Sequence, residues 1–177
     1  MRRLKLFIAC SLDNYIARAD HSIDWLFEGT ENEDYGYSSF YDSIDTTVMG
    51  RNTFDTIITF GNWPYPSKTN YVFTHNPTLF ADHSVQFLTV DAVKWVENLK
   101  NQTGKDIWLV GGGELISTLY NADLIDEYIL SIHPVVLGEG IPLFSHLKKE
   151  QNLRLKETKS YADGLVQIHL EKPISPP

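Results

Sequence analysis

The chain has 177 residues, a net charge of −8 and a single cysteine. This length favours one domain, over residues 1–177, with a core of its own. The acidic charge argues against nucleic acid or an anionic membrane surface as the main partner, and a lone cysteine excludes an internal disulfide and fits a reducing cytoplasm.

The N-terminal half alternates predicted strands and helices. Residues 4–10 form an apolar run that is too short for a signal peptide or a membrane span, and we interpret it as a buried strand that leads into a long loop. The capping-box pattern Thr30-Glu31-Asn32-Glu33 predicts that a helix begins there and continues through Tyr37, Phe40 and Tyr41 at helical spacing. Further elements are predicted as a strand at 46–49, a short helix at 53–58, and strands at 70–73 and 85–88.

The C-terminal half ends in strands. Asp91 is expected to cap a helix that carries Val93, Val96 and Leu99. A strand at 107–110, a helix at 114–120, a long strand at 124–132 and a hairpin of residues 153–161 and 165–170 follow. This order predicts a three-layer α/β fold, in which a mostly parallel central sheet has helices on both faces and a C-terminal antiparallel hairpin.

Two predicted strands run directly into glycine and then into a helix. The first junction reads Gly50-Arg51-Asn52-Thr53 and the second Gly111-Gly112-Gly113-Glu114. Glycine lets the backbone approach a ligand closely, and the free N–H groups of a helix start bind anions. The second junction is not a G-x-G-x-x-G turn, because Ile116 stands at the last glycine position. Together the junctions indicate a nucleotide whose phosphates are bound at two points.

The sequence lacks the motifs of several other kinds of functional site. The six histidines show no metal-ligand spacing and there is no cysteine cluster, so no metal is expected. A Gly-x-Ser-x-Gly elbow and a P-loop lysine are also missing from the sequence.

Four segments resemble one family. They are residues 9–17, 48–54, 110–114 and 134–144, and they resemble the dihydrofolate reductase-like superfamily. The last segment is most similar to the branch formed by the reductase domain of the bifunctional deaminase-reductase of riboflavin biosynthesis. The resemblance implies the dihydrofolate reductase-like fold and hydride transfer from NADPH to a pterin-like or pyrimidine-like heterocycle, as in a 5-amino-6-(5-phosphoribosylamino)uracil reductase. It also implies a homodimer, because relatives in this branch commonly pair.

The resemblance further implies that NADPH lies across the carboxyl ends of the strands. Gly111–Gly113 would take the pyrophosphate, with a cis bond between Gly111 and Gly112, and Arg51 and Thr53 would hold the adenosine-side phosphates. The guanidinium fork suits a ribose 2′-phosphate and favours NADPH over NADH. Ala9 and Ile16 would line the nicotinamide end, although packing of the first strand explains them equally well. The full predicted set is Ala9, Ile16, Gly50, Arg51, Asn52, Thr53, Thr74, His75, Val110, Gly111, Gly112, Gly113, Glu114 and Leu115.

The predicted catalytic and substrate residues are Asp34, Trp25 and Lys68. Dihydrofolate reductases use a carboxylate on the first helix to assist protonation, and Asp34 is the matching position. An apolar groove beside it would raise its pKa, whereas a plain helix-start residue would only stabilise the helix dipole. Trp25 resembles the family's loop tryptophan beside the substrate, with a hydrophobic plug as the alternative. Lys68 stands where the family places an arginine for the folate tail.

Neither family substrate fits the sequence cleanly. Lys68 cannot bind a carboxylate as a two-pronged fork. Residues 28–45 carry six acidic side chains and no Lys or Arg, which would repel a phosphoribosyl group. The leading hypothesis is an NADPH-dependent reductase of the riboflavin-biosynthesis type. A true dihydrofolate reductase and a non-catalytic nucleotide-binding module are the alternatives.

Overall fold

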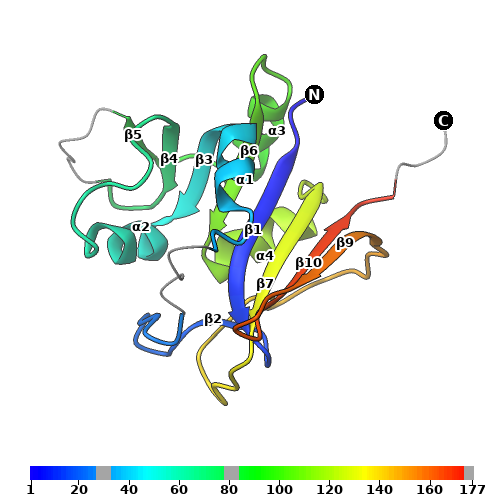
Figure 1. Cartoon of the computed structure of the whole chain (residues 1–177). Helices are drawn as coiled ribbons and strands as arrows, with labels where there is room; N and C mark the ends of the chain where they lie inside the picture. Colours follow the sequence, from blue (N-terminus) through cyan, green and yellow to red (C-terminus); the bar gives the residue numbers. More distant parts are fainter. Residues whose placement is uncertain (27–32, 78–83, 174–177) are drawn as a thin grey trace.

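The computed structural model describes residues 1–26, 33–77 and 84–173, and in these ranges the chain forms a central sheet of eight strands (Figure 1). Their order is β5-β4-β3-β6-β1-β7-β10-β9. Neighbours from β5 to β7 are parallel, and β10 and β9 are antiparallel to their neighbours, so the predicted fold class is confirmed. The strands are β1 (Leu4–Ser11), β3 (Ile44–Gly50), β4 (Thr69–Phe73), β5 (Val85–Leu88), β6 (Asp106–Gly111), β7 (Glu127–His133), β9 (Arg154–Ser160) and β10 (Val166–Glu171).

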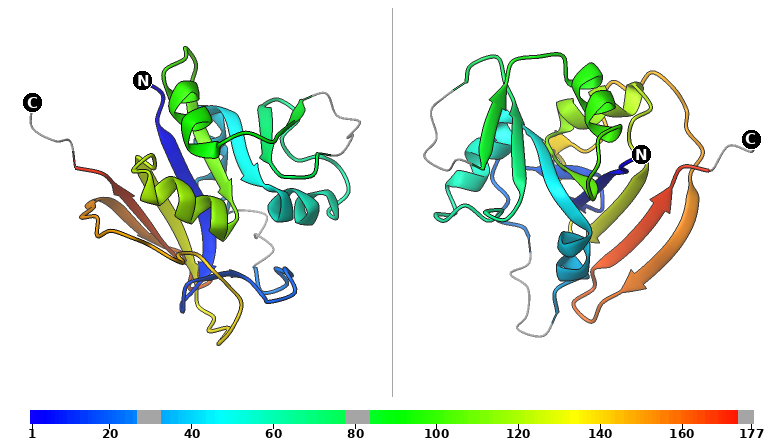
Figure 2. Two further views of the ribbon diagram at one scale, coloured as in Figure 1. Left: turned by 180° about the vertical axis from the view of Figure 1, so that it is seen from behind. Right: turned by 90° about the horizontal axis from the view of Figure 1, so that it is seen from above.

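Helices cover both faces of the sheet. The helix α1 (Tyr37–Ser43) lies in front of it in Figure 1, whereas α3 (Ala92–Lys100) and α4 (Gly113–Asn121) lie in front when the molecule is seen from behind (Figure 2). The helix α2 (Arg51–Ile58) packs on the same side as α1, since Phe40 and Phe54 share one hydrophobic cluster. The helix that follows β3 therefore packs on one face of the sheet, and the helix that follows β6 packs on the other.

The two-residue period of the strands divides the core between these faces. Leu6 of β1 and Leu109 of β6 belong to the cluster beneath α3 and α4. Phe7 and Trp108, one residue away, join the cluster beneath α1 and α2. This alternation is what a sheet buried on both sides requires.

A second, two-stranded sheet was not predicted. It pairs β2 (Tyr15–Ala17) with β8 (Ile141–Pro142) in antiparallel fashion, and we call it the flap. Asp13 ties its two halves together, because its carboxylate accepts hydrogen bonds from the backbone N–H groups of Leu137 (3.0 Å) and Gly138 (2.7 Å). Strands of two or three residues are too short to show the alternation of apolar and polar residues from which strands are predicted.

The first helix begins later than predicted. Residues 30–32 of the capping box lie outside the described residues, but residues 33–36 are not helical and α1 starts at Tyr37. The strand predicted from Leu124 starts at Glu127 instead, because the Leu124 N–H group bonds to the carbonyl of Leu119 at the end of α4.

The predicted cap of α3 is confirmed. The Asp91 side chain accepts a hydrogen bond from the backbone N–H of Lys94 (3.0 Å). Within the described ranges, no helix has the length and apolar character needed to cross a membrane.

Candidate functional site

The two glycine junctions lie next to each other. Met49 of β3 pairs with Gly111 of β6 in the parallel register, so both chains turn into their helices at the same edge of the sheet. A Cβ placed on Gly50 would lie 3.9 Å from the backbone nitrogen of Gly112. The Gly111–Gly112 peptide bond is cis, as the resemblance implied.

Neither of these helix starts has a side-chain cap. Gly50 precedes α2 and Gly112 precedes α4, and no side chain bonds to the free N–H groups there. The other two helices differ, since Asp91 caps α3 and Asp34 accepts a hydrogen bond from Ser38 N–H in α1. Unpaired helix N–H groups that converge from two elements form a site for an anion.

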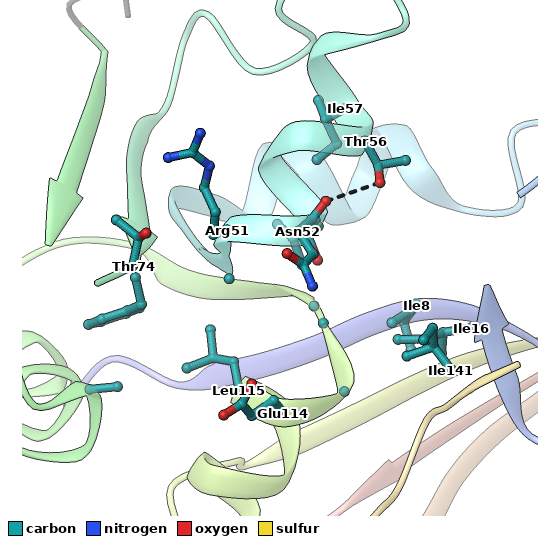
Figure 3. A pocket seen from close by; sticks show the side chains of 18 of the residues that line it. Ile8, Ile16, Arg51, Asn52, Thr56, Ile57, Thr74, Glu114, Leu115 and Ile141 are labelled. Atoms are coloured by element: carbon teal, nitrogen blue, oxygen red, sulfur yellow. Dashed lines mark hydrogen bonds between the residues drawn. The ribbon is translucent and has the colours of Figure 1, made fainter. Parts of the chain in front are cut away.

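A cavity of about 1050 Å³ opens at this edge, along the carboxyl ends of β1, β3, β4 and β6. Open α/β sheets bind ligands in this position, where helices leave adjacent strands toward opposite faces. All of the residues predicted to bind the cofactor line this one cavity. In Figure 3, Arg51 and Thr74 lie toward one end and Ile8, Ile16 and Ile141 toward the other, with the start of α4 between them.

Arg51 is held in place at its end of the cavity. Its Nε donates to Asp55 one helical turn later (2.8 Å), and its Nη1 donates to the carbonyl of Asn76 (2.8 Å). No described residue accepts a hydrogen bond from Nη2. Arg51 is also the one Lys or Arg among the described residues that line the cavity. The guanidinium is therefore positioned for a phosphate.

The flap closes the opposite end. Ile16 and Ile141 come from its two strands and line the cavity beside Ile8 of β1. A Cβ on Gly113 would lie 2.6 Å from the Pro142 carbonyl oxygen, so β8 rests directly on the first turn of α4. The apolar flap therefore covers the helix start at this end of the cavity.

A third region, the aromatic end, was missed by the sequence analysis. It consists of Phe7, Ile57, Tyr65 and Trp108, which line the cavity and belong to the cluster beneath α1 and α2. The Tyr65 and Trp108 rings make an edge contact with centroids 5.0 Å apart. The alternation of Trp108 with Ile107 and Leu109 could have placed Trp108 on this face, but no local pattern points to Tyr65.

The predicted environment of Asp34 is wrong. Asp34 precedes α1, is exposed, and is absent from the described lining of the cavity. Its carboxylate accepts hydrogen bonds from the N–H groups of Gly36 (2.9 Å) and Ser38 (3.1 Å). The hydrogen bonds with Ser38 and Gly36 lower its pKa, whereas an apolar groove would have raised it. Asp34 lies at the helix start, the position that the alternative interpretation gave it.

Lys68 and Trp25 also lie apart from the described lining of the cavity. The Lys68 ammonium donates to the carbonyls of Tyr41 (2.8 Å) and Ile44 (2.9 Å) and covers the Tyr41 ring, so it caps the C-terminal end of α1. Trp25 is buried and its ring packs edge-on against His133 (5.3 Å between centroids). The role of Trp25 beside the substrate stays a prediction.

No cluster of three or more metal-ligating side chains occurs in the part of the chain that the structure describes.

Comparisons with known proteins agree with this fold. The family model of the RibD C-terminal domain matches residues 2–167. Two uncharacterized proteins of Bacillus subtilis (strain 168) are similar: YwjB is 44% identical over 95% of this chain and 97% of its own length, and YyaP is 38% identical over 94% and 93%.

Two solved structures are similar in fold. A protein from Shewanella sp. PV-4 that is named for riboflavin biosynthesis superposes with a TM-score of 0.87, with 30% identity over 97% of this chain and 99% of its own. A deaminase/5-amino-6-(5-phosphoribosylamino)uracil reductase from Thermotoga maritima gives a TM-score of 0.72 at 14% identity, and its match covers 97% of this chain and 57% of that one. The Thermotoga match supports the fold alone.

Proposed function

Because the chain belongs to the RibD C-terminal domain family, we propose that it is an NADPH-dependent reductase. Its reaction is hydride transfer to a C=N bond of a pterin-like or pyrimidine-like heterocycle, and residues 1–177 act as a single reductase domain. The observation that carries the proposal is the pair of uncapped helix starts, behind Gly50 and Gly112, that share one cavity with Arg51.

The cavity suits NADPH along its whole length. The N–H groups of α2 and α4 offer a cradle for the pyrophosphate, and glycine at both junctions leaves room for it. Arg51 Nη2 would bind the ribose 2′-phosphate beside Thr74 and His75, which is the reason to prefer NADPH over NADH. The bound cofactor supplies the hydride.

The chain's own residues shape the place of transfer. Ala9 lines the cavity from β1, and Ile16 and Ile141 cover it from the flap. These side chains would shield the transfer site on the flap side and hold the reacting rings together. The aromatic end, which belongs to the cluster beneath α1 and α2, would receive the substrate ring.

The substrate nitrogen must also gain a proton. Among the described residues of the aromatic end there is no carboxylate, and Asp34 lies at the start of α1 instead. We assign the proton to water that enters through the open side of the cavity, rather than to Asp34.

The same contacts argue against a true dihydrofolate reductase. Lys68 is the cation expected for a folate tail, but it is bound to carbonyls of α1 and to the Tyr41 ring. The riboflavin-biosynthesis type therefore remains the leading hypothesis.

NADPH oxidation, followed by absorbance, tests the function. The panel contains dihydrofolate, an oxidised pterin and a ribosylaminouracil with and without its phosphate. Turnover of any heterocycle other than dihydrofolate supports the proposal. Turnover of dihydrofolate alone makes the chain a dihydrofolate reductase, and NADPH binding without turnover of any compound makes it a non-catalytic module.

A further inference from the structure

Tyr65 sits at the aromatic end of the cavity in a fixed position. It lies between α2 and β4, is 8% exposed and lines the cavity. Its carbonyl accepts hydrogen bonds from the Lys68 N–H (3.2 Å) and from Asn70 Nδ2 (3.1 Å). The ring touches Trp108, whose own Nε1 donates to the carbonyl of Phe7 (2.9 Å). The backbone and the neighbouring rings therefore hold the phenol in one orientation.

The Tyr65 hydroxyl has no hydrogen-bond partner among the described residues. The other strongly buried tyrosines do have one: Tyr120 donates to the carbonyl of Lys149 (3.0 Å) and Tyr128 to Gln151 Oε1 (3.0 Å). Among the described residues, Tyr65 Oη is not one of the buried side-chain atoms that lack a partner, so the hydroxyl stays accessible at the cavity, where water or a ligand can accept its hydrogen bond. Burial raises the pKa of Tyr65, so the group stays protonated and can donate. The cavity is where its partner can come from.

The charges around this end decide against a phosphorylated partner. Arg51 is the one Lys or Arg in the described lining, and it belongs to the start of α2 with Asp55 and Asn76 as partners. Residues 27–32 and 78–83, which the structure does not describe, contain no Lys or Arg. The hollow that adjoins the cavity contains Asp20, Asp24 and Asp55, of which Asp24 is paired with Arg18 and Asp55 with Arg51, and it includes no residue of the aromatic end. A phosphoryl group bound at the aromatic end would therefore have no Lys or Arg of the described lining beside it other than Arg51, which the proposed cofactor site already uses.

We propose that the aromatic end binds an uncharged, planar heterocycle that accepts a hydrogen bond from Tyr65 Oη and packs against Trp108 and Phe7. It discriminates against phosphorylated forms of the same ring. This inference rests on the proposed reductase function and names its substrate class. Tyr65 is then the residue that sets the specificity and orients the ring.

Calorimetric titration tests the assignment with neopterin and neopterin monophosphate, which share a ring and differ by one phosphoryl group. Both are added to protein saturated with NADP⁺, so that the cofactor site is filled. The variant is Tyr65→Phe, and the control is Tyr71→Phe, because Tyr71 packs on Trp95 away from the described lining of the cavity.

We expect neopterin to bind the wild-type protein at least tenfold more tightly than its monophosphate. Tyr65→Phe should weaken neopterin binding about tenfold, the loss of one hydrogen bond, and leave the NADPH affinity unchanged. Tyr71→Phe should alter neither. Equal neopterin affinity in Tyr65→Phe, tighter binding of the monophosphate, or no binding of either compound would overturn the inference. The proposed cofactor function fails separately, if NADPH does not bind the wild-type protein.

Discussion

Gly50 and Gly112 stand side by side at the ends of adjacent parallel strands, with a Cβ on the first placed 3.9 Å from the backbone nitrogen of the second. Each begins a helix that has no side-chain cap, and the two helices pack on opposite faces of the sheet. This pair of helix starts is the central element of the proposed cofactor site.

Gly50→Ala should separate binding from folding. Gly50 has an ordinary extended conformation and the new methyl group would meet nothing closer than 3.9 Å, so the melting temperature should stay the same or rise slightly. The methyl group would, however, project into the space proposed for the phosphates. We expect NADPH affinity to fall at least tenfold, measured by calorimetry. Unchanged affinity would mean that the ligand does not approach this turn.

Gly113→Ala should act on the fold instead. Its Cβ would lie 2.6 Å from the Pro142 carbonyl oxygen, which is backbone and cannot rotate away, so β8 and the flap must shift. Overpacking of this kind costs about 1–3 kcal/mol. A loss of several degrees in melting temperature is expected by scanning calorimetry. A melting temperature equal to that of the wild type would show that the flap is free to move away from α4.

Arg51→Ala should reduce the preference for NADPH. Removing a charge-assisted bond to the 2′-phosphate costs about 1.5–3 kcal/mol, so NADPH should bind roughly ten- to a hundredfold more weakly while NADH binding changes little. Arg18→Ala is the matched control, because Arg18 is an exposed arginine that is paired with Asp24. Equal losses for NADPH and NADH would assign Arg51 to the pyrophosphate or to structure.

Asp34→Asn should leave turnover within about twofold of the wild type, since the carboxylate serves the start of α1. Asp34→Ala should lower the melting temperature, because the N–H groups of Gly36 and Ser38 lose their acceptor. Steady-state kinetics on an active heterocycle provides the check. Abolished turnover in Asp34→Asn, with an unchanged melting temperature, would restore Asp34 as the source of the proton.

Asp13 should make the flap sensitive to strong acid. The hydrogen bond from Ser11, followed by those from the Leu137 and Gly138 N–H groups, lowers the pKa of Asp13 to about 2. A depressed pKa in the folded state stabilises the protein above the unfolded value of about 3.9, and this stabilisation is lost as the pH falls toward 2.

The difference in melting temperature between the wild type and Asp13→Asn should therefore be constant from about pH 8 to about pH 5 and shrink below about pH 4. Asp42→Asn is a suitable comparison, because Asp42 is exposed and lies in α1, outside the flap. A difference that grows as the pH falls would contradict the role of Asp13.

Patterns that are local in the sequence predicted the structure well. Asp91 caps α3 as expected, and the glycine junctions at Gly50 and Gly111 stand at strand ends because glycine and helix signals are read over a few residues. The residues predicted to bind the cofactor lie together at one cavity, because the parallel register brings these two junctions side by side; their binding role stays a prediction.

The substrate side could not be predicted in the same way. The sequence analysis placed Asp34 on the first helix, but this helix starts after Gly36. A turn sets that start, and the helical spacing of Tyr37 and Phe40 does not reveal the turn. Lys68 was assigned by position to a ligand, but the end of α1 lies close enough to take its ammonium. Tyr65 was missed because its partners come from other strands and helices, and only the folded chain brings them together.

The most direct test is a calorimetric titration of the wild-type protein with NADPH and, separately, with NADH. We expect NADPH to bind with a dissociation constant between about 1 μM and 1 mM, the range that is usual for enzyme ligands. NADPH should also bind at least tenfold more tightly than NADH. No binding of NADPH at about 1 mM would contradict the proposed NADPH-dependent reductase function.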